Sequence, residues 1–297
     1  MSHIAVVADY QNVCGECPVW DPEAGVLEWI DYGQRFFRLD WASRRHYMVK
    51  QNFAVNSFRG NRHGGFVIVN NEGFWLWNGE NELRLIAADA DGFKCQLNDC
   101  IADARGRMLA GSYFYNPERG YELGKLIQVE RNGQARVLDE GFHLANGLGF
   151  SPEGRTLYFA DSVARRIYAY GYDQETGAAR NRRVFVQVPN EEGIPDGLAV
   201  DREGYVWCAQ WYGSCVVRYD PEGKVERRVE IPAKQISSLA FGGDELTDVF
   251  VTSAAQSAPM PIMPPGYDPK TGNFGGALYH INLGITGQSA YLADIAL

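Results

Sequence analysis

Short apolar runs alternate with polar turns along the chain, and each of these turns contains a glycine. A β-branched or aromatic run follows each turn, which is typical of a two-stranded hairpin. The turn glycines recur 39 to 50 residues apart, at Gly25, Gly65, Gly106, Gly154, Gly204 and Gly243. A repeat of this size, with strand-like runs and few helical patterns, predicts the four-stranded blade of a β-propeller.

Six repeats predict six blades, so we expect an all-β, six-bladed β-propeller that occupies residues 1–297 as a single domain. A β-sandwich is the alternative, but a sandwich gives no reason for six similar hairpin turns. The first strand-like run, residues 4–8, and the last one, residues 277–283, are expected to share one blade. Such a shared blade would close the ring and remove its open edges.

The runs that precede the turns align in one register in five of the six repeats, and the remaining one, near residues 54–58, fits less well because its turn is longer. The first residue of each aligned run is polar, and these residues are Glu16, Asn98, Asn146, Asp196 and Ser237. Equivalent positions in the blades of a ring lie at equivalent heights around its axis. We therefore expect these side chains to converge at one end of the central channel.

Glu16, Asn98, Asn146 and Asp196 together offer two carboxylates and two carboxamides. Such hard oxygen ligands suit Ca²⁺, Mg²⁺ or Mn²⁺, although Zn²⁺ and Fe²⁺ also occupy open oxygen sites. The pattern predicts one divalent metal ion in the channel and leaves its identity open. Turn chemistry is the alternative, because Asn-Gly and Asp-Gly are common turn formers. That alternative does not explain why Glu16 and Asn98 share the register.

The second strand of each blade returns to the end from which the first strand came, so the residues that close it are expected to surround the same pocket. These residues are Asp31, Tyr113 to Asn116, Ser162, Trp211, Tyr212 and Ser253. Aromatic and hydroxyl groups suit a sugar, and we expect Tyr113, Asn116 and Trp211 to bind substrate. For Tyr113 and Trp211, packing between blades explains the sequence equally well.

Residues 257–276 contain five prolines together with Met260 and Met263, between two strand-like runs. Such a run is stiff, non-helical and long for a propeller connection. The sequence leaves open whether it forms a lid over the channel mouth or a surface loop without a function.

Composition narrows the functional classes. The net charge is −9 with no run of Lys or Arg, which disfavours nucleic acid and anionic membrane surfaces as partners. No apolar stretch has the length of a signal peptide or a membrane span, so we expect a cytoplasmic protein. A closed propeller needs no partner to fold, which favours a monomer or a weak homo-oligomer. The sequence shows no histidine ligand spacing, nucleophile elbow or phosphate loop, which disfavours serine hydrolases and nucleotide enzymes.

Six cysteines are too sparse in 297 residues for a disulfide framework, so reduced thiols are expected. Cys14 and Cys17 form a C-x-x-C pair of the kind found in zinc and redox sites. In a strand, Cys14 would share a face with Glu16 while Cys17 would lie on the opposite face. We therefore expect the pair to be split, which disfavours both roles.

Several motifs within these repeats resemble those of the SMP-30/gluconolactonase/regucalcin family, nearly end to end. The motifs are Gly15-Glu-Cys-Pro-Val-Trp20, Leu97-Asn-Asp99, Asn146-Gly-Leu-Gly-Phe-Ser-Pro-Glu-Gly-Arg-Thr-Leu-Tyr158, Pro195-Asp-Gly-Leu-Ala-Val-Asp-Arg-Glu-Gly204 and Ser238-Leu-Ala-Phe-Gly-Gly243. The resemblance implies a divalent-metal lactonase that opens a small sugar lactone. It also implies that Glu16, Asn146 and Asp196 bind the metal and that Asn98 contacts substrate or the metal's outer ligands.

Lactone hydrolysis needs a carbonyl polariser, a water nucleophile and a base, and the resemblance favours Asp196 as the base. Gln96 stands where animal members of the family have an arginine, so a fixed cationic donor is missing from the substrate site and Gln96 is expected to take its position there. A related esterase or phosphotriesterase and a non-catalytic calcium-binding propeller stay open as alternatives.

Overall fold

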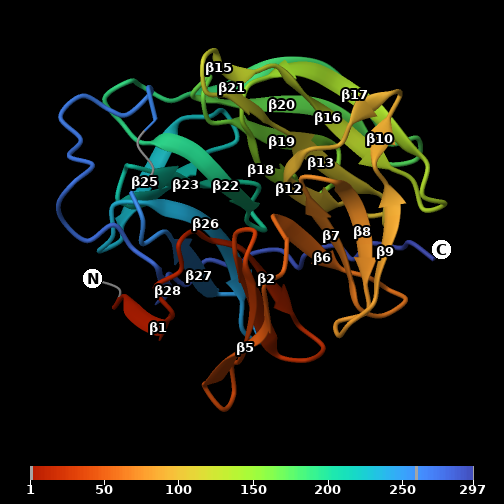
Figure 1. The fold of residues 1–297 in the computed structure, drawn as a ribbon. Coiled ribbons are helices and arrows are strands. Elements are labelled where there is room, and N and C mark those ends of the chain that lie inside the picture. Colours follow the sequence, from red (N-terminus) through yellow and green to blue (C-terminus); the bar gives the residue numbers. More distant parts are fainter. Residues whose placement is uncertain (1–2, 258–259, 297) are drawn as a thin grey trace.

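The computed structural model describes residues 3–257 and 260–296. Its regular structure consists of β-strands, and within these residues no helix is long and apolar enough to span a bilayer. Six four-stranded antiparallel sheets are arranged around a central axis (Figure 1). The predicted all-β, six-bladed propeller is therefore confirmed.

Each blade is a meander in which the first strand is innermost and contacts the first strands of the neighbouring blades. Blade 1 contains β2 (Gly15–Asp21), β3 (Val26–Asp31), β4 (Arg35–Asp40) and β5 (Arg45–Gln51). Blade 2 contains β6 (Ser57–Gly60), β7 (Phe66–Asn70), β8 (Gly73–Trp77) and β9 (Leu83–Ala87). Blade 3 contains β12 (Leu97–Ala102), β13 (Met108–Ser112), β16 (Gly124–Val129) and β17 (Ala135–Phe142). Blade 4 contains β18 (Ala145–Phe150), β19 (Thr156–Asp161), β20 (Arg166–Asp173) and β21 (Ala178–Gln187); blade 5 contains β22 (Ile194–Val200), β23 (Val206–Trp211), β24 (Cys215–Tyr219) and β25 (Val225–Glu230).

The sixth blade joins the two ends of the chain. It contains β26 (Ile236–Gly242), β27 (Asp248–Ser253), β28 (Ala277–Asn282) and, at its outer edge, β1 (Ala5–Asp9). Ala5 lies opposite His280 and Asp9 lies opposite Ala277. The prediction that the first and last strands share a blade is confirmed, and this pairing closes the ring.

Two short hairpins lie outside the blades. One consists of β10 (Asp89–Ala90) and β11 (Phe93–Lys94). The other consists of β14 (Phe114–Asn116) and β15 (Gly120–Glu122), and it is inserted between the second and third strands of blade 3. This second insertion interrupts the repeat next to the end of the channel where the inner strands begin.

The repeated turn between the first and second strands has the same construction in several blades. All six turn glycines adopt a positive φ, between 65° and 85°, which glycine reaches without a steric penalty. Asp103 Oδ1 accepts hydrogen bonds from the backbone N–H groups of Arg105 and Arg107, both at 2.9 Å. Asp201 Oδ1 likewise accepts two backbone N–H groups at 3.0 Å. The periodicity in the sequence is thus the repetition of one capped turn.

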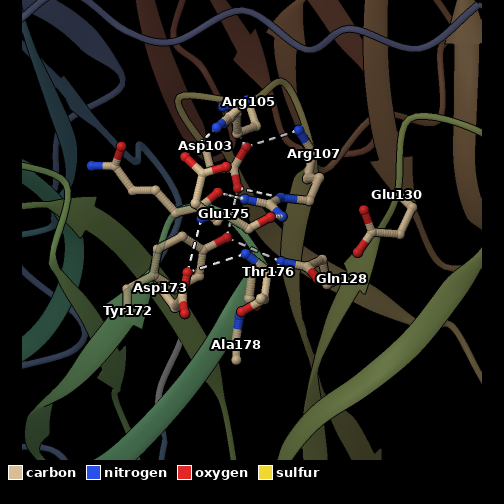
Figure 2. Close-up of polar contacts among 12 residues, drawn as sticks. Asp103, Arg105, Arg107, Gln128, Glu130, Tyr172, Asp173, Glu175, Thr176 and Ala178 are labelled. Carbon is tan, nitrogen blue, oxygen red and sulfur yellow. Dashed lines mark hydrogen bonds and ion pairs between the residues drawn. The ribbon is translucent and has the colours of Figure 1, made fainter.

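A buried polar network ties blade 3 to blade 4 (Figure 2). Arg107 Nε donates to Asp103 Oδ2 at 2.6 Å, and the Tyr172 hydroxyl donates to the same oxygen at 2.6 Å. Gln128 Nε2 donates to the Tyr172 hydroxyl at 3.0 Å. Because Tyr172 lies on β20, these bonds fix the position of blade 4 against blade 3.

The last residues of the chain, 284–296, form a C-terminal strap across the end of the ring where the capped turns lie (Figure 1). Gly287 N–H donates to the carbonyl of Leu246 in blade 6 at 2.8 Å, and Ala293 N–H donates to the carbonyl of Gly60 in blade 2 at 2.9 Å. Between them, Gln288 Nε2 donates to carbonyls of blades 4 and 5. The strap and the inner strands line a partly open cavity of about 110 Å³ at this end of the channel.

Candidate functional site

The opposite end of the channel, where the inner strands begin, is shaped by β-bulges. The pairing register shifts between Glu16 and Val19 in β2, and at the corresponding points of β12, β18, β22 and β26. A bulge re-aims a side chain out of the regular alternation of a strand. Asn98, Asn146 and Asp196 lie within three of these bulges, and Glu16, which pairs with Ile30, borders the one in β2. Inner strand β6 pairs without a shift and contributes no residue to the cavity described below.

The glycines that follow two of these residues are required by packing. Asn146-Gly147 and Asp196-Gly197 lie within β18 and β22, so the turn-former explanation for these pairs is wrong. A Cβ on Gly147 would lie 2.3 Å from the backbone nitrogen of Leu198. A Cβ on Gly197 would lie 2.3 Å from the hydroxyl of Ser238. The inner strands therefore approach too closely for any side chain at these two positions.

A cavity of about 280 Å³ opens at this end of the channel. It is lined by Cys14, Glu16, Tyr32, Asn98, Tyr113, Tyr121, Leu144, Asn146, Ser162, Ile194, Asp196, Trp211 and Met260. The structure thus brings seven of the residues predicted to surround the site together: Glu16, Asn98, Asn146, Asp196, Tyr113, Ser162 and Trp211. Five others that were expected there do not line the cavity: Asp31, Phe114, Tyr115, Tyr212 and Ser253.

Gln96 and Asn116 do not line this cavity. The carbonyl of Gln96 accepts the N–H of Tyr113 at 3.2 Å, so its backbone supports a residue that does line it. Asn116 Oδ1 accepts the N–H groups of Glu118 and Arg119, at 2.8 and 3.1 Å, in the turn between β14 and β15. Asn116 thereby shapes the inserted hairpin, and substrate contact by Gln96 and Asn116 stays a prediction.

A directed chain of hydrogen bonds orients the two carboxamides. The carbonyl of Pro195 can only accept, so the Ser162 hydroxyl donates to it at 2.6 Å and accepts from Asn146 Nδ2 at 2.9 Å. Asn146 Oδ1 therefore lies on the other side of the amide, where it accepts from Asn98 Nδ2 at 2.8 Å. Asn98 Oδ1 in turn accepts the Tyr32 hydroxyl at 2.8 Å. Each carbonyl oxygen keeps a second lone pair for a ligand.

The two carboxylates that line the cavity are poorly solvated. Burial raises the pKa of Glu16 to about 8, and the charge of Asp99 adds to the rise. Burial also raises the pKa of Asp196 well above its usual range, with further contributions from Glu16 and Asp99. Asp196 is 5% exposed, and its Oδ1 atom has no hydrogen-bond partner within the described residues. Two acids confined in this way favour a bound cation, which would offset their repulsion.

Within residues 3–257 and 260–296, no group of three or more His, Cys, Asp or Glu side chains is arranged to hold a metal ion. A metal in this cavity would therefore need carboxamide oxygens beside the carboxylates of Glu16 and Asp196. The hydrogen-bond chain holds the Asn146 oxygen in a position to supply one. The oxygen-only donor set and the unpartnered Asp196 oxygen both fit a hard divalent cation.

The two cysteines of the C-x-x-C pair are separated, as the sequence predicts. Cys14 lines the cavity, whereas the buried Cys17 Sγ accepts hydrogen bonds from the Ser57 hydroxyl and from Arg59, both at 3.2 Å. None of the six cysteines, all of which lie in the described residues, forms a disulfide in the structure.

Six cavity residues were not assigned to the site from the sequence: Cys14, Tyr32, Tyr121, Leu144, Ile194 and Met260. Tyr32 lies one position beyond Asp31, the last residue of β3, so the rule for second-strand ends points to it only approximately. Tyr121 lies on β15, in an insertion that has no counterpart in the other blades. Met260 belongs to the proline-rich run and lines the cavity. The contact of Met260 with the cavity places the start of the proline-rich run at the cavity mouth.

Comparisons with known proteins cover most of the chain. A family model described as "SMP-30/Gluconolactonase/LRE-like region" matches residues 14–255. Pentonolactonase XacC of Haloferax volcanii is 31% identical over 292 residues, which are 98% of this chain and 98% of that protein. Regucalcin of Xenopus laevis is 32% identical over 247 residues, which are 81% of this chain and 83% of that protein. A solved luciferin-regenerating enzyme superposes with a TM-score of 0.86 at 24% identity, over 99% of this chain and 100% of that chain, which supports the propeller fold.

Proposed function

This chain belongs to the SMP-30/gluconolactonase/LRE-like family, and we propose that it hydrolyses a small sugar lactone with the help of one divalent metal ion. The observation that carries the proposal is the convergence of Glu16, Asn98, Asn146 and Asp196, from four different inner strands, in one cavity. A pentonolactone is the first substrate to test, because the pentonolactonase of Haloferax volcanii matches nearly the whole chain.

Glu16, Asn146 and Asp196 would hold the metal ion, because their oxygens line the cavity and Asp196 Oδ1 has no other partner among the described residues. When bound, a divalent cation polarises a carbonyl oxygen and lowers the pKa of water. Calcium, zinc, manganese, magnesium and ferrous iron are all compatible with these ligands.

The protein's own groups perform the remaining steps. The Asp196 carboxylate accepts a proton from the attacking water as general base. The hydroxyls of Tyr32 and Tyr113 and the amide of Asn98 form a polar wall for the sugar hydroxyls, and Trp211 offers an apolar surface to the ring. Water forms a bond to the acyl carbon of the lactone, and the acyl C–O bond of the ring breaks. The ring oxygen leaves as a hydroxyl with the proton that Asp196 took from the water, and the new carboxylic acid ionises to a carboxylate and a proton. The acidic side chains repel that anion, which favours its release over that of the uncharged substrate.

The test is a pH-stat assay of acid release, corrected for uncatalysed opening, with pentono- and hexonolactones and each of the five metals. We expect metal-dependent hydrolysis that Asp196→Ala abolishes while the protein stays folded. Full activity in Asp196→Ala, or in metal-free protein, would contradict the proposal. Preference for an aryl ester or a phosphotriester would favour the esterase alternative. Metal binding without turnover of any of these compounds would favour a calcium-binding propeller.

A further inference from the structure

Residues 260–276, which lie between β27 and β28, begin at the mouth of the cavity and are here called the cover segment. Met260 lines the cavity, and the Tyr121 hydroxyl donates a hydrogen bond to Met260 Sδ at 3.2 Å. Since Tyr121 lies on the inserted hairpin of blade 3, this contact joins two insertions across the opening. The match to the family model ends at residue 255, so the cover segment lies outside it.

The cover segment is anchored in its middle to blades 4 and 5. Arg165 is buried, and its NH2 group donates to the carbonyl of Ile262 at 2.8 Å. Its NH1 group donates to the carbonyl of Pro189 at 2.9 Å and to that of Gly193 at 3.1 Å, in the loop before β22. One guanidinium therefore fastens the cover segment to the loop that leads into the Asp196 strand.

The far part of the cover segment is anchored to the connection between β25 and β26. Lys234 Nζ donates to the carbonyls of Asp268, at 2.9 Å, and Thr271. The backbone N–H of Lys234 donates to the carbonyl of Asn273 at 2.9 Å. Tyr267 packs on Tyr212 with ring centroids 4.5 Å apart. With these attachments, the cover segment acts as a fixed wall and not as a freely opening flap.

The two methionines of the cover segment have different neighbours. Met260 and Met263 both pack, half-buried, against the apolar cluster of Ile194, Trp211, Tyr212 and Ala254. Met260 also lines the cavity, and Met263 does not. The carboxylates lie on the inner strands at the floor, so a lactone that reacts there directs its remaining atoms toward Met260 and Tyr121.

We infer that Met260 is a specificity-determining residue that limits the substrate to a single sugar ring by blocking the space above the reacting group. The inference rests on the proposed lactonase function and deepens it. A pentonolactone or hexonolactone fits beneath the wall, whereas an aldonolactone that carries a second sugar collides with Met260. Shortening this side chain opens the mouth without altering any residue assigned to the metal or to proton transfer.

The experiment compares kcat/KM for a pentonolactone with that for a glucosyl-substituted aldonolactone in the wild type, Met260→Ala and the matched control Met263→Ala. We expect Met260→Ala to raise the ratio in favour of the disaccharide lactone by at least about tenfold. Met263→Ala should leave the ratio within about twofold of the wild-type value. Met260→Phe, which narrows the same space, should lower kcat/KM for a hexonolactone more than for a pentonolactone.

An unchanged ratio in Met260→Ala, an equal change in Met263→Ala, or efficient wild-type hydrolysis of the disaccharide lactone would each overturn the inference. These outcomes leave the lactonase function intact, because the wild type still opens the pentonolactone. A wild type that opens neither lactone would overturn the proposed function itself. Thermal melts of each variant establish that it is folded, and if Met260→Ala is not, Met260→Phe decides the inference.

Discussion

Asn98 donates a hydrogen bond from Nδ2 to Oδ1 of Asn146 at 2.8 Å, and this bond joins blades 3 and 4 at the floor of the cavity. The same Nδ2 atom also donates to the carbonyl of Ala145 at 2.7 Å, so the Asn98 amide is fixed against rotation. Asn146, which is proposed to bind the metal, is therefore oriented in part by Asn98 of the neighbouring blade. Several measurable consequences arise from this arrangement of polar groups.

Ser162→Ala is expected to weaken metal binding by about 10- to 100-fold, which is the usual effect of losing a group that orients a ligand. The substitution leaves Asn146 Nδ2 without its acceptor, so the carboxamide can rotate and withdraw its oxygen. Titration calorimetry with each divalent metal measures the change. Ser162→Thr keeps the hydroxyl and should restore most of the affinity. Equal losses in the two variants would show that the hydroxyl does not orient Asn146.

Asp196→Asn should have opposite effects on the metal-free and the metal-loaded protein. It removes a buried carboxyl group whose pKa is raised by burial, so the metal-free protein is spared the cost of burying its charge or taking up a proton and should unfold at a higher temperature than the wild type. It should also abolish the rise in melting temperature on adding metal and lower kcat by about 10²-fold or more. Asp244→Asn, at an exposed position, is the control and should change none of these values. Metal stabilisation equal to that of the wild type would exclude Asp196 as a ligand.

The stability of the metal-free protein should fall as pH rises from about 4.5 to about 8. The pKa of Glu16 is 4.5 in an unfolded chain and about 8 in the cavity, so the folded protein binds more protons than the unfolded one in this range. Stability decreases with pH wherever the folded state holds the extra proton. Urea unfolding at several pH values, with a chelator present, measures the trend. In Glu16→Gln the fall should be smaller, and an identical profile would contradict the assignment.

Arg107→Met should lower the free energy of unfolding by about 3–5 kcal/mol, because it leaves the buried Asp103 carboxylate without its cation. Arg105→Met is the matched control two residues away. Arg105 pairs with Glu175 at the exposed surface, so its loss should cost about 1 kcal/mol or less (Figure 2). Urea denaturation of both variants tests the difference. Equal costs would mean that the network between blades 3 and 4 contributes little.

The repeat and its register could be predicted because each blade has a glycine with positive φ in its first turn and several blades cap that turn with a polar side chain. The register places Glu16, Asn98, Asn146 and Asp196 correctly in one cavity. The β-bulges that aim these side chains inward have no sequence signal of their own. Blade 2 aligns weakly with the other repeats, and its inner strand has no β-bulge and adds no residue to the cavity.

The insertions and the C-terminal strap could not be predicted from the repeat. Tyr121 and Met260 reach the cavity from insertions, and insertions interrupt the period on which the alignment depends. The C-terminal strap has no alternation of apolar and polar residues that would reveal it in the sequence. It is held to the ring by hydrogen bonds from backbone groups and from the side-chain amide of Gln288. Gln96 and Asn116 do not line the cavity, because the position of a residue in a strand or loop does not determine whether its side chain reaches inward.

The C-terminal strap also determines how molecules travel through the protein. Residues 288–291 line the cavity at the far end of the channel, so part of the chain itself occupies the end opposite the carboxylates. Under the proposed function, lactone and sugar acid then exchange through the end that Tyr121 and Met260 line. A product that stayed bound there would compete with the next lactone, and repulsion of its carboxylate by Glu16 and Asp196 limits that competition.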